Sequence, residues 1–236
     1  MSVTARSESS LDVVLRRAGA VLSIREGQPL AVHFGSAAAE LAVCVRAVGL
    51  VDRSDLSALT LEAPPAQLSA LTARLAGATV APGGLVSASG AWWCGESASQ
   101  VIVVCDRRTA ERLAEALRGD AARHVAVRDR SSELSAIGLL GPATGKVLAA
   151  LGAYGPWGDP RQATPFARSS VEGIAAWWLL QSDRRALALV NRAHAGEAWL
   201  ALEQVGRPFG ISCVGHEAAC RYALMERVRP VAPAYI

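Results

Sequence analysis

The chain has 236 residues, enough for one large domain or two closely paired ones with a sizeable core. Hydrophobic residues make up 51% and charged residues 19%, and no apolar run approaches the roughly eighteen residues of a membrane-spanning helix. Because the N-terminus lacks an apolar signal core, we expect a cytoplasmic protein with no membrane partner. The net charge of +3 comes from scattered arginines without a basic stripe or interleaved aromatics, which argues against nucleic-acid binding.

The cysteines form no CxxC pair and are not spaced with histidines as zinc ligands would be. We therefore expect no metal site, and free buried thiols in a reducing compartment. The five residues are Cys44, Cys94, Cys105, Cys213 and Cys220.

Residues 1–30 are expected to form an N-terminal arm and helix. Apolar residues at helical spacing predict a helix from residue 11 to about residue 21, with Asp12 favourably placed in its first turn. A second helix is predicted over residues 37–48, closed by Gly49 as the residue that ends it.

Several stretches of the sequence occur a second time further along the chain, in the same order. Several matches in register indicate a duplicated unit. The predicted halves are residues 31–122 and 123–236. The matching stretches are 51–64 with 128–142, 91–93 with 176–178, and 101–110 with 186–195.

Each copy predicts a strand, a helix, a hairpin and a second helix. In the first copy the strand covers residues 56–61, and Pro64 ends it because proline cannot donate to a ladder. The fold class is therefore α+β, with pseudo-two-fold symmetry. Because neither half-sheet can bury both faces alone, we expect the two to pack together, with a ligand cleft near the pseudo-axis.

Three segments carry a family resemblance. They are Val32-His33-Phe34-Gly35-Ser36 with Gly49-Leu50-Val51-Asp52-Arg53-Ser54, then Leu140-Gly141-Pro142-Ala143, and finally Gly215 to Glu226. Together they resemble the glycine-cleavage T-protein (aminomethyltransferase) family over roughly residues 30–228. The resemblance implies a T-protein-like folate-binding fold that lacks the C-terminal barrel domain, with tetrahydrofolate held between two similar halves.

The departures from the family pattern concern the folate site. The stretch where T-proteins place an assisting aspartate is residues 76–79, which holds no acid. The family's asparagine falls on Cys105, and its pterin-binding glutamate falls near Leu187 in an apolar strand. The chain also resembles the γ subunit of heterotetrameric sarcosine oxidase, which is similar in length and has a tryptophan-rich strand before an apolar one.

A pterin needs a carboxylate or amide for its polar edge and apolar faces for stacking. The candidate folate-binding residues are Asp55, Trp93, Cys105, Trp178, Arg221 and Glu226. For the anionic glutamate tail, Arg221, Arg184 or Arg168 could serve. His33 and His216 are the best general-base candidates, and His33 or Glu226 is the residue expected to move a proton during transfer.

Each candidate also has an ordinary structural interpretation. Glu226 can end a helix in solvent, and Asp55 can sit in a turn. Each Trp-Trp pair can place one ring in the core and the other on the opposite sheet face. Cys105 has no adjacent base in sequence to activate it.

Two functions from different classes follow. The first is transfer of a methylene or methyl group between tetrahydrofolate, as 5,10-methylenetetrahydrofolate, and a small amine. The second is a non-catalytic subunit or scaffold of an oxidase-type complex, like the γ subunit. A third alternative is a homodimer that binds another small anion. The missing aspartate favours the non-catalytic subunit. The segment from Phe34 to Ser54 favours folate-dependent transfer, which is the function we expect from the sequence.

Overall fold

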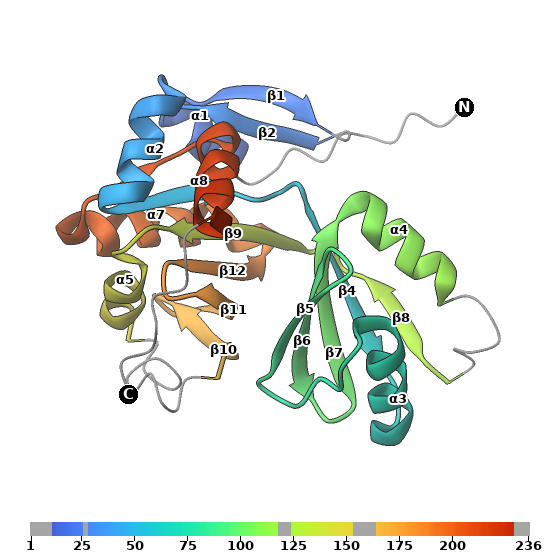
Figure 1. Ribbon diagram of the computed structural model, residues 1–236. Helices are drawn as coiled ribbons and strands as arrows, with labels where there is room; N and C mark the ends of the chain where they lie inside the picture. The colour runs from blue at the N-terminus through green and yellow to red at the C-terminus, as the bar shows by residue number, and fades with distance from the viewer. Residues whose placement is uncertain (1–10, 26–27, 118–123, 153–163, 229–236) are drawn as a thin grey trace.

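The computed structural model describes residues 11–25, 28–117, 124–152 and 164–228. The chain is an α+β protein with two lobes, each built on one sheet (Figure 1). We call the lobe with the six-stranded sheet the first lobe and the lobe with the five-stranded sheet the second lobe. A ribbon of β1 (Val21–Arg25) and β2 (Gln28–His33) lies over the first lobe (Figure 1).

The six-stranded sheet has the order β10-β11-β12-β9-β3-β13, and only β13 is parallel to its neighbour. In that order the strands are Phe166–Val171, Ile174–Ser182, Arg185–Asn191, Leu134–Leu140, Val48–Asp52 and Ile211–Cys213. Helices α1, α5 and α7 cover one face around Trp178 and Trp199, both fully buried, and α2 and α8 cover the β3 end of the other face. These helices are Asp12–Arg17, Thr144–Ala150, Ala195–Gly206, Ala37–Arg46 and His216–Val228, and two 3-10 turns, Arg192–His194 and Arg207–Phe209, flank α7.

The five-stranded sheet is antiparallel, with the order β5-β6-β7-β4-β8. In that order the strands are Leu85–Ala88, Ala91–Ser97, Gln100–Asp106, Leu56–Glu62 and Ala126–Asp129. Helices α3 (Pro65–Ala76) and α4 (Arg107–Ala116) cover one face of this sheet, around the buried Trp93. The Asp106 side chain caps α4 by accepting from the Thr109 N–H at 2.9 Å.

The same order of elements occurs in both lobes. The run β4-α3-β5-β6-β7-α4 builds the second lobe, and β9-α5-β10-β11-β12-α7 builds the first. The two sheets exchange one strand each. β3 directly precedes β4 of the second lobe in the chain but pairs with β9 in the first lobe. β8 directly precedes β9 of the first lobe but pairs with β4 in the second lobe. The uncovered faces of the two sheets pack against each other, as the sequence predicted.

Two predicted helices were too long. The first helix ends at Arg17, and the chain turns at Gly19 (φ +85°) into β1, so residue 21 lies in a strand. The second ends at Arg46, and Gly49 lies inside β3. A Cβ at Gly49 would meet Cys44 Sγ at 2.7 Å, so glycine is needed there for close packing and not to end a helix.

Candidate functional site

The two Trp-Trp pairs divide their rings between the faces of each sheet, because successive side chains on a strand point to opposite sides. Trp93 and Trp178 are buried under the helices of their own lobes. Trp92 and Trp177 face the other lobe and pack against the apolar cluster between the sheets. The ordinary interpretation of the pairs is therefore confirmed, and the rings that face the space between the lobes are Trp92 and Trp177.

The cluster between the sheets, here called the intersheet cluster, is closed to solvent. Its eight buried members are between 0% and 4% exposed. They are Cys94, Ile102, Val104, Ala136, Phe166, Leu179, Leu187 and Leu189. A water-filled cavity against these side chains would leave part of their surface accessible. The buried centre of the interface is therefore inaccessible to solvent.

The rim of this cluster carries charge next to an aromatic ring. The guanidinium carbons of Arg130 and Arg168 lie 5.5 and 5.3 Å from the centre of the Trp177 ring, within cation–π range. Arg168 is directly opposite Trp177 in the β10–β11 pairing, and Arg130 reaches it from the turn after β8. Arg130 also forms an ion pair with Glu133 at 3.1 Å. The rim thus offers an aromatic surface beside two cations.

A second polar group lies at the turn between β3 and β4. The Arg53 guanidinium binds the Asp55 carboxylate with two hydrogen bonds of 2.8 Å, from Nε and Nη2. Gly138 on β9 lies beside this turn: a Cβ there would meet Val51 Cγ1 at 2.7 Å and would lie 3.6 Å from Arg53 Cγ, an ordinary contact distance. Asp55 therefore already has a cationic partner within the chain.

Asp52 is a buried carboxylate in the same turn, only 1% exposed. Its Oδ1 accepts from the Ser54 N–H at 2.9 Å and from the Ser54 hydroxyl at 2.6 Å. Burial raises its pKa from 3.8 to about 6, and these two bonds offset only part of that rise. The carboxyl group can therefore gain or lose a proton near neutral pH.

We predict that Asp52→Asn stabilises the protein at neutral pH. Because the folded-state pKa lies above 3.8, the stability that Asp52 contributes is full at low pH and is lost as pH rises through about 6. Two pKa units correspond to roughly 3 kcal/mol, which is the upper limit of the gain at about pH 7.5. Asparagine keeps the oxygen that accepts both bonds. Urea unfolding at about pH 4 and about pH 7.5 measures the difference.

The matched control is Asp129→Asn. Asp129 begins the second Asp-Arg-Ser sequence, at the end of β8, and accepts from the Ser131 N–H at 2.9 Å, but it is exposed. Its replacement should change stability by less than about 0.5 kcal/mol at either pH. Equal effects of the two substitutions would contradict the assignment of the raised pKa to burial.

The remaining sequence candidates lie on three elements. His33 ends β2, and its Nδ1 accepts from the Gly35 N–H at 3.3 Å. Arg221 and Glu226 lie on α8, with Arg221 exposed and Glu226 half-buried. Cys105 is fully buried on β7, where burial raises its thiol pKa to about 12. Such a thiol is an inert core residue rather than a nucleophile.

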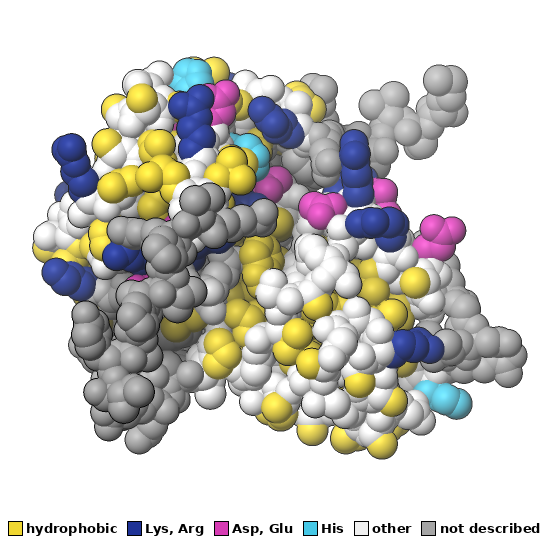
Figure 2. Space-filling view, in the orientation of Figure 1, with side chains coloured by type: hydrophobic (Ala, Val, Ile, Leu, Met, Phe, Trp, Pro, Cys, Tyr) yellow, Lys and Arg dark blue, Asp and Glu magenta, His cyan; other side chains and the backbone are white. Residues whose placement is uncertain are grey.

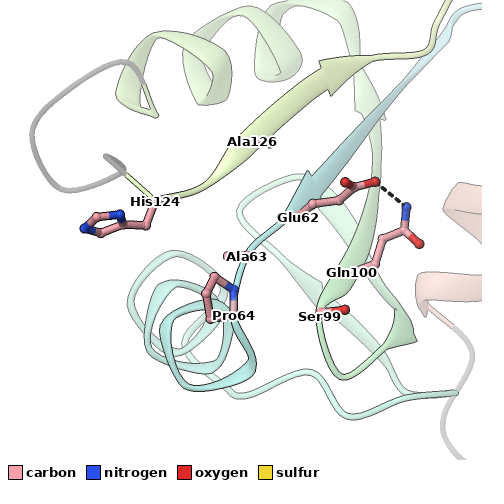
Figure 3. A pocket seen from close by; sticks show the side chains of 7 residues that line it. All are labelled: Glu62, Ala63, Pro64, Ser99, Gln100, His124 and Ala126. Atoms are coloured by element: carbon pink, nitrogen blue, oxygen red, sulfur yellow. Dashed lines mark hydrogen bonds between the residues drawn. The ribbon is translucent and has the colours of Figure 1, made fainter.

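A hollow of about 580 Å³ lies where β4 ends, β6 turns into β7 and β8 begins (Figure 3). Glu62 and Gln100 face each other in it, with Gln100 Nε2 donating to Glu62 Oε1 at 2.9 Å. The ring of His124 points away from that pair (Figure 3). The other lining residues are Ala63, Pro64, Ser99 and Ala126, so this hollow contains none of the sequence candidates.

Within the described ranges, no group of three or more His, Cys, Asp or Glu side chains is placed to hold a metal ion. No helix in that part of the chain is both long and apolar enough to span a bilayer.

Sequence reasoning did not single out Arg130 or Asp52. A usable signal was the repeated Asp-Arg-Ser, at 52–54 and 129–131, which marks the ends of β3 and β8. Both arginines of the repeat pair with a nearby acid, Asp55 or Glu133.

No family model matches the chain, and no curated protein matches it. Solved structures do match. The glycine cleavage system aminomethyltransferase T from Bartonella henselae has 14% identity and a TM-score of 0.74, over 93% of this chain and 62% of that one. A chain of heterotetrameric sarcosine oxidase from Corynebacterium sp. U-96, solved with pyrrole 2-carboxylate, has 21% identity and a TM-score of 0.59. That match covers 75% of this chain and 93% of the oxidase chain.

This chain therefore spans less than two thirds of the length of the aminomethyltransferase. At these identities the likeness is one of fold. It confirms the predicted resemblance in that sense: the chain has the fold shared by the aminomethyltransferase and the sarcosine oxidase chain.

Proposed function

We propose that the chain is a non-catalytic subunit of an oxidase-type complex, with the T-protein fold but without its folate pocket. The observation that carries the proposal is the closed intersheet cluster, whose eight core side chains are at most 4% exposed. Pockets for drug-sized ligands are typically about 300–1,000 Å³. Folate between the sheets would require these side chains to line an open space of that order.

The chemistry of the interface supports the same function. Leu187, near which the family's pterin-binding glutamate falls, is 2% exposed inside the intersheet cluster. Two predicted stacking rings, Trp93 and Trp178, lie in the separate cores beneath the helices. Asp55, a predicted carboxylate for the pterin edge, is bound to Arg53. Two predicted stacking groups therefore lie in different cores, and the predicted carboxylate is engaged by an arginine of the same chain.

The partner chain is proposed to lie along the seam between the lobes. Hydrophobic side chains are visible along that seam (Figure 2). Trp92, Trp177, Leu56 and Leu85 are the partly buried members of the intersheet cluster. Partly exposed tryptophan beside arginine is the composition typical of a protein–protein contact. The match over 93% of the sarcosine oxidase chain agrees with a protein of this size working inside a complex.

The test is to purify the tagged chain from its own source under native conditions. We expect a stoichiometric complex with larger chains that takes up oxygen when supplied with sarcosine or another N-methyl amine. Trp177→Ala should weaken the complex at least about tenfold, the loss of about 1.4 kcal/mol. The control Leu200→Ala, on α7 and 53% exposed, should leave the complex intact. A chain that purifies alone, or as a homodimer, would contradict the proposal.

Folate-dependent one-carbon transfer is the second candidate, and two observations favour it. Trp177 beside Arg130 and Arg168 suits an aromatic, anionic ligand at the rim. Asp52, with a pKa of about 6, is able to exchange a proton near neutral pH. In this alternative the chain would hold 5,10-methylenetetrahydrofolate and an amine at attack distance, with His33 or Glu226 moving a proton.

We also infer that the lobes descend from one duplicated unit. The recurring order of elements in the two sheets supports this. The proposed halves stay at residues 31–122 and 123–236, with residues 1–30 as an arm. Reciprocal pairing of β3 with β9 and of β8 with β4 would then hold the two copies together.

A further inference from the structure

Helix α8 carries a thiol and an imidazole one turn apart. Cys220 Sγ lies 3.2 Å from His216 Nε2, within hydrogen-bond range for sulfur. Cys220 is exposed and His216 is half-buried. A nucleophile in contact with a base, open to solvent on one side, is the arrangement that reactive cysteines use.

The groups around this pair match the charges that a reaction would create. The Arg53 guanidinium interacts electrostatically with Cys220. Asp55 interacts with His216 and favours the imidazolium, as does Glu217, whereas Arg53 and Arg25 oppose it. Burial, the largest effect, lowers the His216 pKa below 6.5. At neutral pH the ring is therefore neutral, and Nε2 can accept the proton of the thiol.

The other cysteines lack these features. Burial raises the pKa of Cys44 and Cys105 to about 12 and that of Cys94 well above its usual value. Cys213 donates to the Glu203 carboxylate at 2.9 Å, and its pKa is raised by burial and by that carboxylate. Cys220 is the only one of the five free cysteines that is exposed.

We propose that Cys220 is a modification site, a nucleophilic thiol served by His216 that reacts with low-molecular-weight disulfides such as glutathione disulfide. As Sγ attacks one sulfur of the disulfide, the thiol proton passes to His216 Nε2. The new bond joins Cys220 to that sulfur, the original S–S bond breaks, and the second sulfur leaves with the electron pair as a thiolate. The product is a mixed disulfide at Cys220 beside the Arg53–Asp55 ion pair.

The test uses the full-length protein and dithiobis-nitrobenzoate, an aromatic disulfide whose released thiolate is coloured. We expect one thiol per chain to react in a fast phase that Cys220→Ser removes and Cys213→Ser keeps. His216→Phe should slow this phase by about tenfold or more, since a positioned base contributes roughly 100-fold or more to such steps. It should also remove the inflection that the imidazole gives to the pH profile of the rate.

Two further variants separate chemistry from folding. His216→Asn keeps a polar side chain that cannot take the proton, and it should slow the reaction as His216→Phe does. His194→Phe, an exposed histidine away from any cysteine contact, should leave the rate unchanged. Glutathione disulfide, followed by intact mass, should add one tripeptide at Cys220. A fast phase that survives in Cys220→Ser, or an unchanged rate and pH profile in folded His216→Asn, would overturn the proposal.

Discussion

Replacing Gly215 with alanine should destabilise the protein by more than about 3 kcal/mol, because backbone atoms leave no room for a side chain. A Cβ there would lie 2.1 Å from the Val32 carbonyl oxygen and 2.5 Å from His33 Cα. The Gly215 N–H also donates to Glu40 Oε2 at 2.7 Å, while Glu40 Oε1 accepts from the Phe34 N–H at 2.8 Å. The substitution would therefore push α8 away from the end of β2 and disturb a buried carboxylate held by two backbone donors.

Thermal and urea unfolding measure this loss, and Gly145→Ala is the control. Gly145 lies in the first turn of α5 with nothing within 4 Å of its Cβ position. Alanine there should leave stability unchanged or raise it by roughly 0.5–1 kcal/mol. A folded Gly215→Ala variant with wild-type stability would show that α8 does not pack against β2 as described.

Replacing Trp178 with alanine should cost about 3–5 kcal/mol, the usual range for a fully buried aromatic residue. Trp178 is 0% exposed and packs in the core of the first lobe together with Trp199. Replacing its neighbour Trp177 should cost only about 1–2 kcal/mol, from partly buried surface and two cation–π contacts. Each of the two substitutions therefore serves as the control for the other, and urea unfolding measures the loss of stability in both.

A larger loss of stability for Trp177→Ala than for Trp178→Ala would contradict the placement of the two rings. Equal and large losses would mean that Trp177 is as fully enclosed as Trp178. The measurement therefore bears on function, because Trp177, unlike Trp178, remains available at the rim for a ligand or a partner chain.

The central strands and hairpins of both lobes could be predicted from the sequence because their signals are local. Apolar runs bounded by Pro64 and Pro142 define β4 and β9, and the Trp-Trp motifs place the following hairpins. Alternation along a strand also predicted that each pair splits its rings between two faces. It did not reveal which face meets the other lobe, since that depends on where the helices pack.

Other features depend on contacts between distant segments and had no local signal. Strand β13 is three residues long and forms only by pairing with β3. The exchange of β3 and β8 between the sheets likewise joins residues far apart in the chain. For the same reason the residues near Trp177 could not be assembled from sequence, because Arg130 and Arg168 come from separate segments.

The central claim, that the chain has no folate pocket either between the sheets or at their rim, is tested most directly by isothermal titration of the full-length protein. Tetrahydrofolate and 5,10-methylenetetrahydrofolate are the ligands, with Trp177→Ala and Leu200→Ala alongside. We predict no binding heat at millimolar ligand for any of these proteins. Micromolar binding that Trp177→Ala loses and Leu200→Ala keeps would contradict the claim and place folate at the rim beside Arg130 and Arg168.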